Sequence, residues 1–382
     1  MKIPLAWLQL THEKIRLLVA LAGIGFADML MFMQLGFRQA LFQSNVTLHE
    51  SLQGDVFLIS PQSDALISLK TFSRRRLYES LAVEGVADAA PLYVGFAFWK
   101  NPVERTTRKL MVLGVNPADD LFNLPRLQEN IDQIKLQDVV LYDDQSRPEY
   151  GPVAEQVILG KTVETELESR NIRVGGLFSL GASFAADGNV ITSDVNFVRI
   201  FSGREPGLID IGVLQLEPTA DLDAVLASLK AKLPKDVLVL SKAEFIQYEK
   251  DYWSTSTPIG FIFALGTGMG FIVGTVIVYQ ILYTDVADHL PEYATLKALG
   301  YRDIYFVKVV FQEAVLLAAV GYIPGFLVAS GLYVLTAGAT NLPIAMTISR
   351  AVTVLILTIV MCCFSGGVAV RKLRAADPAD IF

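Results

Sequence analysis

Residues 284–303 read TDVADHLPEYATLKALGYRD, a polar stretch that separates two long apolar runs. The stretch predicts a short helix over residues 288–300. Asp288 is placed to cap its N-terminus, and Pro291 falls in the first turn, where a missing N–H does no harm. Gly300 is a natural stop, since glycine readily adopts the left-handed conformation that ends helices. A capped helix between two apolar runs predicts a rigid element at a membrane surface that can pass a push into both runs.

Four apolar runs dominate the composition of the chain. The 382 residues are 52% hydrophobic and only 19% charged, with a mean hydropathy of +0.44, which is too apolar for an ordinary soluble protein. Each run is long enough to cross a hydrocarbon core, which needs roughly 20 apolar residues. The runs are 15–41, 258–283, 304–337 and 351–370.

The fold class that follows is a membrane protein with four transmembrane α-helices and a large α+β extracytoplasmic domain between the first and the second. We expect residues 1–41 to hold an amphipathic helix at 3–14 and the first span. The amphipathic helix would lie in contact with membrane lipid. Residues 42–256 form the outer domain. Residues 257–382 hold spans two to four, the short helix and a basic tail.

Basic residues near the span ends predict the orientation, because cytoplasmic ends carry an excess of Lys and Arg. Arg38 and Arg350 oppose the orientation that the other basic residues favour. The outer domain is therefore expected outside the plasma (inner) membrane, in the periplasm of a double-membraned bacterium. No basic stripe appears, which argues against nucleic acid as a partner. The groups assigned to the cytoplasm are Lys2, Lys14 and Arg16, then Lys297, Arg302 and Lys308, and finally Arg371, Lys372 and Arg374.

The outer domain shows alternating strand and helix patterns. A β-α-β start and a β-α-β end predict an α+β sandwich whose halves flank an insertion at about 117–205. Strands are expected at 55–60, 92–99, 108–115, 155–158, 173–180, 190–192, 209–216 and 237–240, and helices at 73–81, 161–169, 194–201 and 220–232.

Two features of the spans are candidates for function. Gly266, Gly270 and Gly274 recur every four residues on span two, a spacing typical of close helix packing in lipid. Asp28 and Glu313 are ionisable residues at membrane depth, where such groups usually face protein or water. For Asp28 two interpretations stay open: a hydrogen bond to a neighbouring helix, or a place on a conduit or in a dimer seam.

No pattern for catalysis or metal binding stands out. The chain lacks the Gly-x-x-x-x-Gly-Lys-Ser/Thr phosphate loop and the Gly-x-Ser-x-Gly nucleophile elbow. His12, His49 and His289 are far apart in the sequence, and none has the spacing of zinc ligands. We therefore expect a non-catalytic membrane subunit with no bound metal or cofactor.

The layout of one span, a large outer domain and three further spans resembles the FtsX/MacB-like permease family of ABC transporters. Residues 292–302, EYATLKALGYR, are similar to the family's Arg-Glu-x-Gly-x-x-Lys-Ala-Leu-Gly-Ala segment after its second span. The tail at 371–380, RKLRAADPAD, is similar to the family's basic, Asp-Pro-containing end. Within the family, the full sequence is most similar to the DevC-type permeases of cyanobacterial glycolipid exporters.

The resemblance implies a homodimeric membrane subunit whose ABC ATPase is a separate chain on the cytoplasmic side. It also implies a periplasmic adaptor (membrane fusion protein) and an outer-membrane TolC-like duct, through which a substrate such as a glycolipid is expelled from the periplasm. This chain departs from the family segment at Pro291 and Ala294, where the family has arginine and glycine. The helix 288–300 would dock on the ATPase through Glu292, Tyr293, Leu296, Lys297, Leu299 and Gly300.

Two other functions stay open from the sequence. A signal relay of the same architecture would transmit the ATPase state outward to activate a cell-wall hydrolase, and it would need no cargo path. A membrane-anchored enzyme is the third possibility, against which the lack of a nucleophile–base or metal arrangement argues. The large outer domain favours export, since a relay could manage with a smaller one.

Overall fold

The computed structural model describes residues 12, 14–205, 207–340 and 342–375 of the chain. The expected amphipathic helix at 3–14 falls almost entirely outside these residues. The chain divides into two compact units, which are described separately. The helical unit lies within residues 1–40, 258–340 and 344–382, and the outer domain comprises residues 41–257 together with 341–343.

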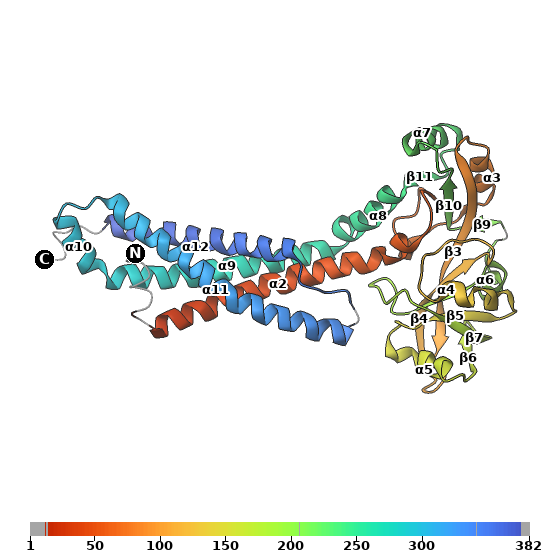
Figure 1. Ribbon diagram of the computed structural model, residues 1–382, viewed down its shortest axis with the longest axis horizontal. Coiled ribbons are helices and arrows are strands. Elements are labelled where there is room, and N and C mark those ends of the chain that lie inside the picture. The colour runs from red at the N-terminus through yellow and green to blue at the C-terminus, as the bar shows by residue number, and fades with distance from the viewer. Residues whose placement is uncertain (1–11, 13, 206, 341, 376–382) are drawn as a thin grey trace. The chain divides into compact units, whose positions relative to one another are not determined.

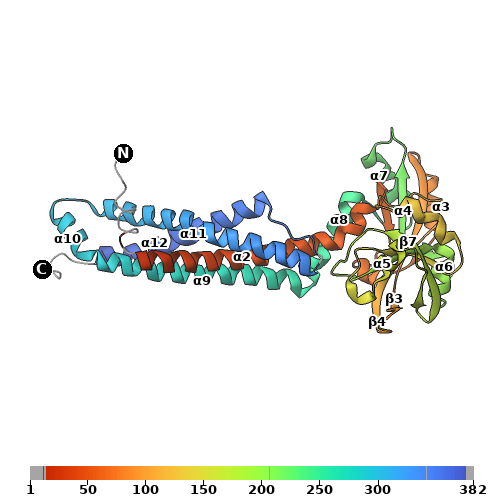
Figure 2. The ribbon, with the colours of Figure 1, turned by 60° about the horizontal axis from the view of Figure 1, so that its bottom comes forward.

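The helical unit consists of four long helices and a short one. The long helices are α2 (Lys14–Ser51), α9 (Pro258–Asp288), α11 (Asp303–Thr340) and α12 (Ile348–Ala375), and the short one is α10 (Leu290–Ala298). Within the described ranges, four segments are long and apolar enough to cross a membrane, and they coincide with the four expected spans. Helix α12 packs along both α9 and α11 (Figure 1, Figure 2).

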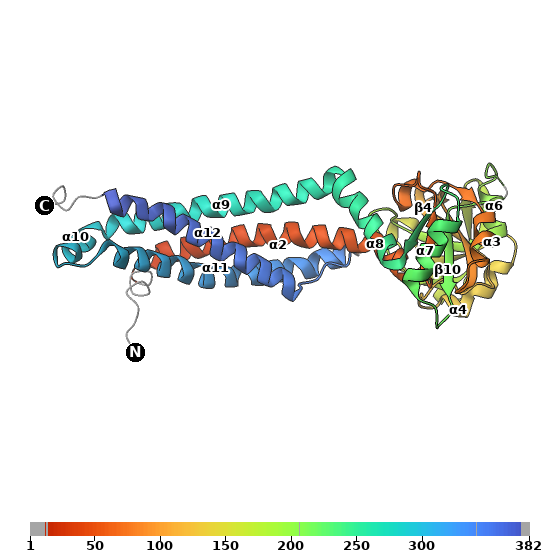
Figure 3. The ribbon, with the colours of Figure 1, turned by 90° about the horizontal axis from the view of Figure 1, so that it is seen from above.

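The helices approach most closely where glycine removes a side chain. Gly25 of α2 faces Gly325 of α11, and a Cβ added at Gly325 would lie 2.9 Å from the carbonyl oxygen of Gly25. Helix α2 contacts α9 on its other side, so that it lies between the two (Figure 3). Helices in lipid gain little from apolar burial, so this close backbone approach supplies much of their packing energy.

In the described part of the outer domain, nine strands form one sheet in the order β11-β1-β10-β3-β4-β8-β5-β7-β6. The β4–β8 and β5–β7 pairs are parallel and the other neighbours are antiparallel. The part of the sheet from β3 to β6 closes into a ring, because β6 also pairs with β3 at Trp99 and Leu167, while β10, β1 and β11 extend from β3 outside the ring. The strands are β1 (Val56–Ile59), β3 (Val86–Lys100), β4 (Thr107–Val115), β5 (Val139–Asp143), β6 (Val163–Leu167), β7 (Arg170–Phe178), β8 (Asn189–Ser193), β10 (Ile211–Leu216) and β11 (Leu238–Ser241).

A second, two-stranded sheet pairs β2 (Phe72–Ser73) with β9 (Leu208–Ile209). The four strands β5 to β8 come from the segment assigned to an insertion, and they lie together on one side of β4. The helices of the outer domain are η1 (Leu66–Ser68), α3 (Arg75–Leu81), α4 (Leu127–Asn130), η2 (Ile131–Lys135), η3 (Pro148–Tyr150), α5 (Val153–Ile158), α6 (Asp194–Ile200), α7 (Leu222–Lys232), α8 (Lys242–Asp251) and the π-helical turn η4 (Tyr252–Ser256).

Both faces of the large sheet are covered by apolar side chains. Along β3, Tyr93 and Trp99 belong to one buried cluster, and Leu92 and Val94 belong to the other, as the two-residue period of a strand requires. Side chains from α3, α5, α6 and α7 complete the first cluster, and side chains from α4, α8 and the end of α2 complete the second. The order of elements along the chain confirms the predicted β-α-β start and end of the domain: β1, α3 and β3 form the start, and β10, α7 and β11 form the end.

The expected strand at 155–158 is wrong. These residues belong to the helix α5, which follows Pro152 at its N-cap and ends before Gly160 at φ +72°. The β-branched and apolar residues of this stretch suggested a buried strand. In the structure Val153 is buried, Ala154 and Val157 pack against the core, and Ile158 is exposed. The inward-facing residues therefore follow the spacing of a helix and not the alternation of a strand.

The expected helix at 161–169 is also wrong, because residues 163–167 form the strand β6. Glutamate favours helices, and this composition suggested one. The alternation of the stretch is the stronger signal: Val163 and Leu167 point into the core while Glu164 is exposed. Pairing with β7 and β3 rewards that alternation, whereas an isolated nine-residue helix would leave both apolar residues partly in water.

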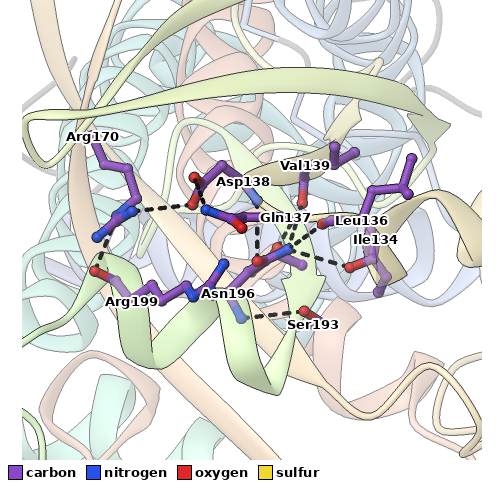
Figure 4. A network of polar contacts seen from close by, with 10 residues as sticks. Ile134, Leu136, Gln137, Asp138, Val139, Arg170, Ser193, Asn196 and Arg199 are labelled. Carbon is purple, nitrogen blue, oxygen red and sulfur yellow. Dashed lines mark hydrogen bonds and ion pairs between the residues drawn. The ribbon is translucent and has the colours of Figure 1, made fainter.

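A buried asparagine on α6 holds the loop that leads into β5 (Figure 4). The Asn196 Nδ2 donor lies 3.2, 2.8 and 3.3 Å from the carbonyl oxygens of Ile134, Leu136 and Val139, and its Oδ1 accepts the Asp138 N–H at 3.1 Å. Asp138 has a positive φ of 57°, a backbone conformation that residues other than glycine seldom adopt. The amide therefore satisfies backbone groups that the sheet leaves unpaired and supports an unfavourable turn.

We expect Asn196→Ala to destabilise the outer domain by about 3 kcal/mol, because three carbonyls and one N–H lose a buried partner. The melting temperature should fall by roughly 6 °C or more for a domain of this size. Thermal unfolding in detergent, followed by tryptophan fluorescence, measures the shift. Asn171→Ala is the control, since Asn171 is exposed on β7; equal losses in the two variants would contradict the role of the Asn196 contacts.

Candidate functional site

The short helix α10 spans Leu290–Ala298, so it begins two residues later than predicted. Helix α9 continues through Asp288, and His289 occupies the N-cap position of α10, with Pro291 in the first turn. The prediction that Asp288 caps the helix is wrong. Its carboxylate accepts a hydrogen bond from Arg16 Nη2 of α2 at 2.5 Å and is therefore engaged with another helix.

The C-terminal end of α10 forms as predicted at Gly300. Gly300 has a φ of 97°, and its N–H donates to the Lys297 carbonyl at 3.0 Å. The Tyr301 N–H donates to the Leu296 carbonyl at 3.2 Å. These two bonds are the Schellman arrangement, which needs a left-handed residue where glycine carries no penalty. Helix α10 is therefore a short element with a defined end.

The predicted contact residues of α10 divide between two faces. Leu299 is 73% exposed and Glu292 is also exposed, whereas Leu296 and Lys297 are half-buried. Tyr293 is only 2% exposed, and its ring centroid lies 5.3 Å from that of Phe306 in α11. The expected docking role of Tyr293 is therefore corrected: its buried ring anchors α10 to α11.

Three exposed apolar side chains extend the surface of α10 beyond Gly300, and the sequence interpretation missed them. Tyr301, Ile304 and Tyr305 are 48%, 56% and 37% exposed, and the two tyrosine rings lie 5.0 Å apart. Their signal was present in the sequence, because Tyr301 follows the glycine stop directly and Ile304 and Tyr305 begin the third apolar run. We call Glu292, Leu299, Tyr301, Ile304 and Tyr305 the connection surface.

A group of charged residues lies where α9 meets α10. Arg16 contacts Asp288 as described, and its Nη1 lies 3.7 Å from Asp285 Oδ1. The His289 ring nitrogen Nδ1 is 3.7 Å from the same carboxylate oxygen. The fully buried Glu313 of α11 lies against the Asp285 side chain. The structure thus brings Glu313 to this group, although 28 residues separate it from Asp285 in the sequence.

The glycine stripe of α9 lies inside the bundle of this chain. A Cβ added at Gly274 would overlap the Met361 sulfur of α12 and lie 2.8 Å from the Ala27 Cβ of α2. One added at Gly266 would overlap the Gln34 side chain, and one at Gly270 would lie 3.1 Å from Met31 Cγ. The stripe is therefore in contact with α2 and α12, and it is not a free surface for a second copy of the chain.

We expect Gly274→Val to destabilise the helical unit by about 1–3 kcal/mol, because the added methyl groups have no space between α2 and α12. The thermal stability of the purified chain in detergent measures the effect. Gly268→Val is the matched control, since a Cβ at Gly268 meets nothing within 4 Å. If the two variants lose the same stability, close packing at Gly274 is not what matters.

Asp28 forms a hydrogen bond within the helical unit. Its Oδ1 accepts the Thr358 hydroxyl of α12 at 2.6 Å, and the side chain is fully buried. The Asp28 Cβ occupies the space that a side chain at Gly325 would fill. Of the two interpretations left open by the sequence, the structure shows the hydrogen bond to a neighbouring helix.

A buried carboxylate also lies in the outer domain, and the sequence interpretation missed it. Glu249 of α8 is 2% exposed; its Oε1 accepts the Trp253 Nε1–H at 2.8 Å and its Oε2 accepts the Leu66 N–H at 2.9 Å. His49 Nε2 of the end of α2 lies 3.6 Å from Oε2. Burial raises the pKa of Glu249 to about 7, against the effect of the two hydrogen bonds. No local pattern predicts this node, since its members are up to 204 residues apart.

The raised pKa of Glu249 makes the outer domain less stable as pH rises. The carboxyl ionises near 4.5 in the unfolded chain and near 7 in the fold, so its contribution to stability is present below pH 4.5 and is lost as pH rises through about 7. Between pH 5 and 8 the Glu249 carboxyl should cost on the order of 3 kcal/mol. The buried His49 beside it should return part of that loss, because burial lowers its pKa from 6.5 to about 3 and the neutral ring favours the fold above pH 6.5. Melting temperatures at the two pH values test this.

Glu249→Gln should remove the carboxyl's share of that pH dependence and leave the opposite share of His49, so the variant should gain stability relative to the wild type as pH rises from 5 to 8. Glu84→Gln, at an exposed position of the same domain, is the control and should keep the wild-type dependence. An unchanged slope in Glu249→Gln would show that other groups are responsible.

No site for a metal appears among the described residues, in which no three His, Cys, Asp or Glu side chains converge. The outer domain has a polar cleft of about 580 Å³ beside β6 and β7. Its lining includes Arg105, Asp138, Glu166 and Arg173 and contains no histidine, cysteine or serine. The cleft therefore offers charged groups of both signs for contact.

Comparison with known proteins identifies the C-terminal third of the chain. Residues 258–378 match the sequence model of a family described as FtsX-like permease C-terminal. This range contains α9, α10, α11 and α12, so the match covers three of the four apolar helices and the short helix between them. No curated protein sequence matches the chain.

Two solved structures are similar to the chain at low identity. The periplasmic region of MacB from Actinobacillus actinomycetemcomitans is 12% identical, with a TM-score of 0.33, over 54% of this chain and 96% of that one. The extracellular domain of the noncanonic ABC-type transporter YknZ from Gram-positive bacteria is 12% identical, with a TM-score of 0.34, over 49% of this chain and 100% of that one. The permease assignment depends on the sequence match over residues 258–378.

Proposed function

We propose that this chain is the transmembrane permease subunit of a MacB-type ABC exporter, which couples ATP hydrolysis by a separate ATPase to expulsion of a substrate from the periplasm. The observation that carries the proposal is the FtsX-like permease match over 258–378, which spans α10 and the two helices that flank it. The chain has no phosphate loop of its own, so the energy would come from a partner.

The geometry of α10 supports a role as the coupling helix. The helix is short, ends in a glycine-dependent Schellman arrangement, and is anchored to α11 by the Tyr293–Phe306 contact. Its exposed side continues into the apolar connection surface, where Leu299 and Ile304 project. An exposed apolar patch on an otherwise polar connection is typical of a protein-binding surface. We propose that the ATPase docks on the connection surface.

The outer domain supports export over a signal relay. It provides a partly closed sheet, helices on both faces and a polar cleft, which is more surface than transmission alone requires. We propose that it lies in the periplasm, above the inner membrane, and contacts an adaptor that leads to an outer-membrane TolC-like duct. Following the DevC-type resemblance, the proposed substrate is a glycolipid, and the proposed assembly contains two copies of this chain.

We expect Leu299→Asp to weaken coupling to the ATPase by roughly tenfold, because a charge at the centre of an apolar docking surface must be desolvated. The measurement is ATP hydrolysis by the partner with and without the purified permease in lipid vesicles. Leu159→Asp is the matched control: Leu159 is 70% exposed, but it follows α5 in the outer domain. Full stimulation by Leu299→Asp would refute the proposed docking surface.

Export and relay differ in what crosses the membrane system. An exporter extracts labelled glycolipid from vesicles in an ATP-dependent manner when the adaptor is present. A relay leaves the lipid in place and activates a hydrolase instead, so ATP-dependent activation without lipid extraction would favour the relay.

A further inference from the structure

The charged group at the meeting point of α9 and α10 includes a residue from the far end of the chain. Arg16 belongs to α2, yet its guanidinium contacts Asp285 and Asp288, which lie in the last turn of α9. The Arg16–Asp288 contact joins residues 272 positions apart. Helix α10 starts two residues after Asp288, so this contact fastens the first span to the start of α10.

The negative charge at the C-terminal end of α9 explains why Arg16 is held there. The C-terminal end of a helix carries a partial negative charge, and acidic side chains there are unfavourable. The last turn of α9 contains two of them and no basic residue. Asp285 is nearly buried and also faces Glu313, which adds a second carboxyl group. Arg16 supplies the positive charge that this end of α9 lacks, so its release would be costly.

The contact is more than an exposed ion pair, which would contribute little. The side chain of Asp285 is 7% exposed and that of Arg16 is 26% exposed. The guanidinium presents several donors in a rigid plane, so one arginine can reach both carboxylates, which a lysine ammonium could not do in the same way. The Asp285 carbonyl also accepts the His289 N–H at 3.1 Å, so the same turn holds the N-cap of α10.

Helix α10 is thus held by three neighbours. It follows α9 directly, Tyr293 anchors it to α11, and Arg16 connects its start to α2. Helices α2 and α9 are also in close contact at Ala27 and Gly274, which lie along the helices away from the Arg16 contact. A displacement of α10 can therefore reach α2 by way of Arg16 as well as through helix packing.

We propose that Arg16 is a positioning residue through which the coupling helix α10 moves the first span together with the second. The proposal rests on the proposed function, since it presumes that an ATPase displaces α10. When α10 moves, Arg16 holds α2 to the end of α9, so that the two helices that lead to the outer domain move as a pair. Without Arg16, α11 still follows α10 through Tyr293, but α2 does not.

Spin-label distances in lipid vesicles, with the ATPase bound and nucleotide added or withheld, test this role. One label pair at Leu18→Cys and Ile356→Cys reports α2 relative to α12, and a second pair at Val315→Cys and Ile356→Cys reports α11, away from the connection surface. The three positions are exposed. The native cysteines are first replaced by Cys362→Ala and Cys363→Ala. In the wild-type background, nucleotide should change both distances.

Arg16→Gln should reduce the nucleotide-dependent change of the α2 pair about fivefold or more, within the range of allosteric coupling energies, and leave the α11 pair unchanged. ATPase binding should stay the same, because Arg16 is not part of the connection surface. A residue that only stabilises the fold would lower the melting temperature without separating the two label pairs. Arg16→Lys should fall between the variant and the wild type.

Two further variants sharpen the test. Lys14→Gln removes the same charge from an exposed residue of the same helix end, and it should behave as the wild type. Arg16→Asp combined with Asp288→Arg re-creates an ion pair with the signs exchanged and should restore part of the response.

The outcomes separate the two proposals. A wild-type response in Arg16→Gln, or an equal loss in Lys14→Gln, overturns the role of Arg16 and leaves the proposed function intact. If neither label pair of the wild-type chain responds to nucleotide with the ATPase bound, the proposed function fails and the role of Arg16 fails with it.

Discussion

Close backbone contact of α2 with α9 and α11 is the interaction on which the helical unit depends. In lipid, apolar side chains gain nothing by leaving the solvent, so helices associate through tight packing and internal hydrogen bonds. Glycine supplies the first at Gly325 and Gly274, where any side chain would collide with the neighbouring helix, and at Gly25, where a Cβ would be tight at 3.3 Å from Gly325 N. Asp28 supplies the second: it lies in the space left by Gly325 and accepts the Thr358 hydroxyl. The same small residues thus allow the approach and make room for the polar contact.

The meeting point of α9 and α10 follows the same logic with charges. Acidic groups at the end of α9 require a cation, and the nearest described one is Arg16 of α2. The aromatic contact of Tyr293 with Phe306 fixes the other side of α10. The short helix is therefore held by its inner face, which leaves the connection surface exposed for a partner. Anchoring on one side and exposure on the other fit the proposed role of α10 as a coupling helix.

The outer domain depends on buried polar groups as well as on its two apolar clusters. Asn196 satisfies the backbone of the loop before β5, and Glu249 gathers the indole N–H of Trp253 and the N–H of Leu66. A buried polar group without partners is costly, so such nodes permit only the arrangement that satisfies them. They specify how the α6, α8 and η1 segments meet, which apolar contacts alone would leave less strictly determined.

The sequence by itself determined the four spans, the end of α10 at Gly300, the glycine stripe and most strands, because each is written in a local pattern: an apolar run, a left-handed glycine, a spacing of four or an alternation of two. Tertiary structure decided the rest. Residues 163–167 became a strand because β3 and β7 are there to pair with it. Asp288 accepts a hydrogen bond from Arg16 instead of capping α10, and Tyr293 packs on Phe306. Glu249 contacts the Leu66 N–H, and Glu313 contacts Asp285, which are distant in the sequence. Local propensities are worth a few tenths of a kcal/mol per residue, and a single buried contact exceeds them, so long-range partners decide wherever the two disagree.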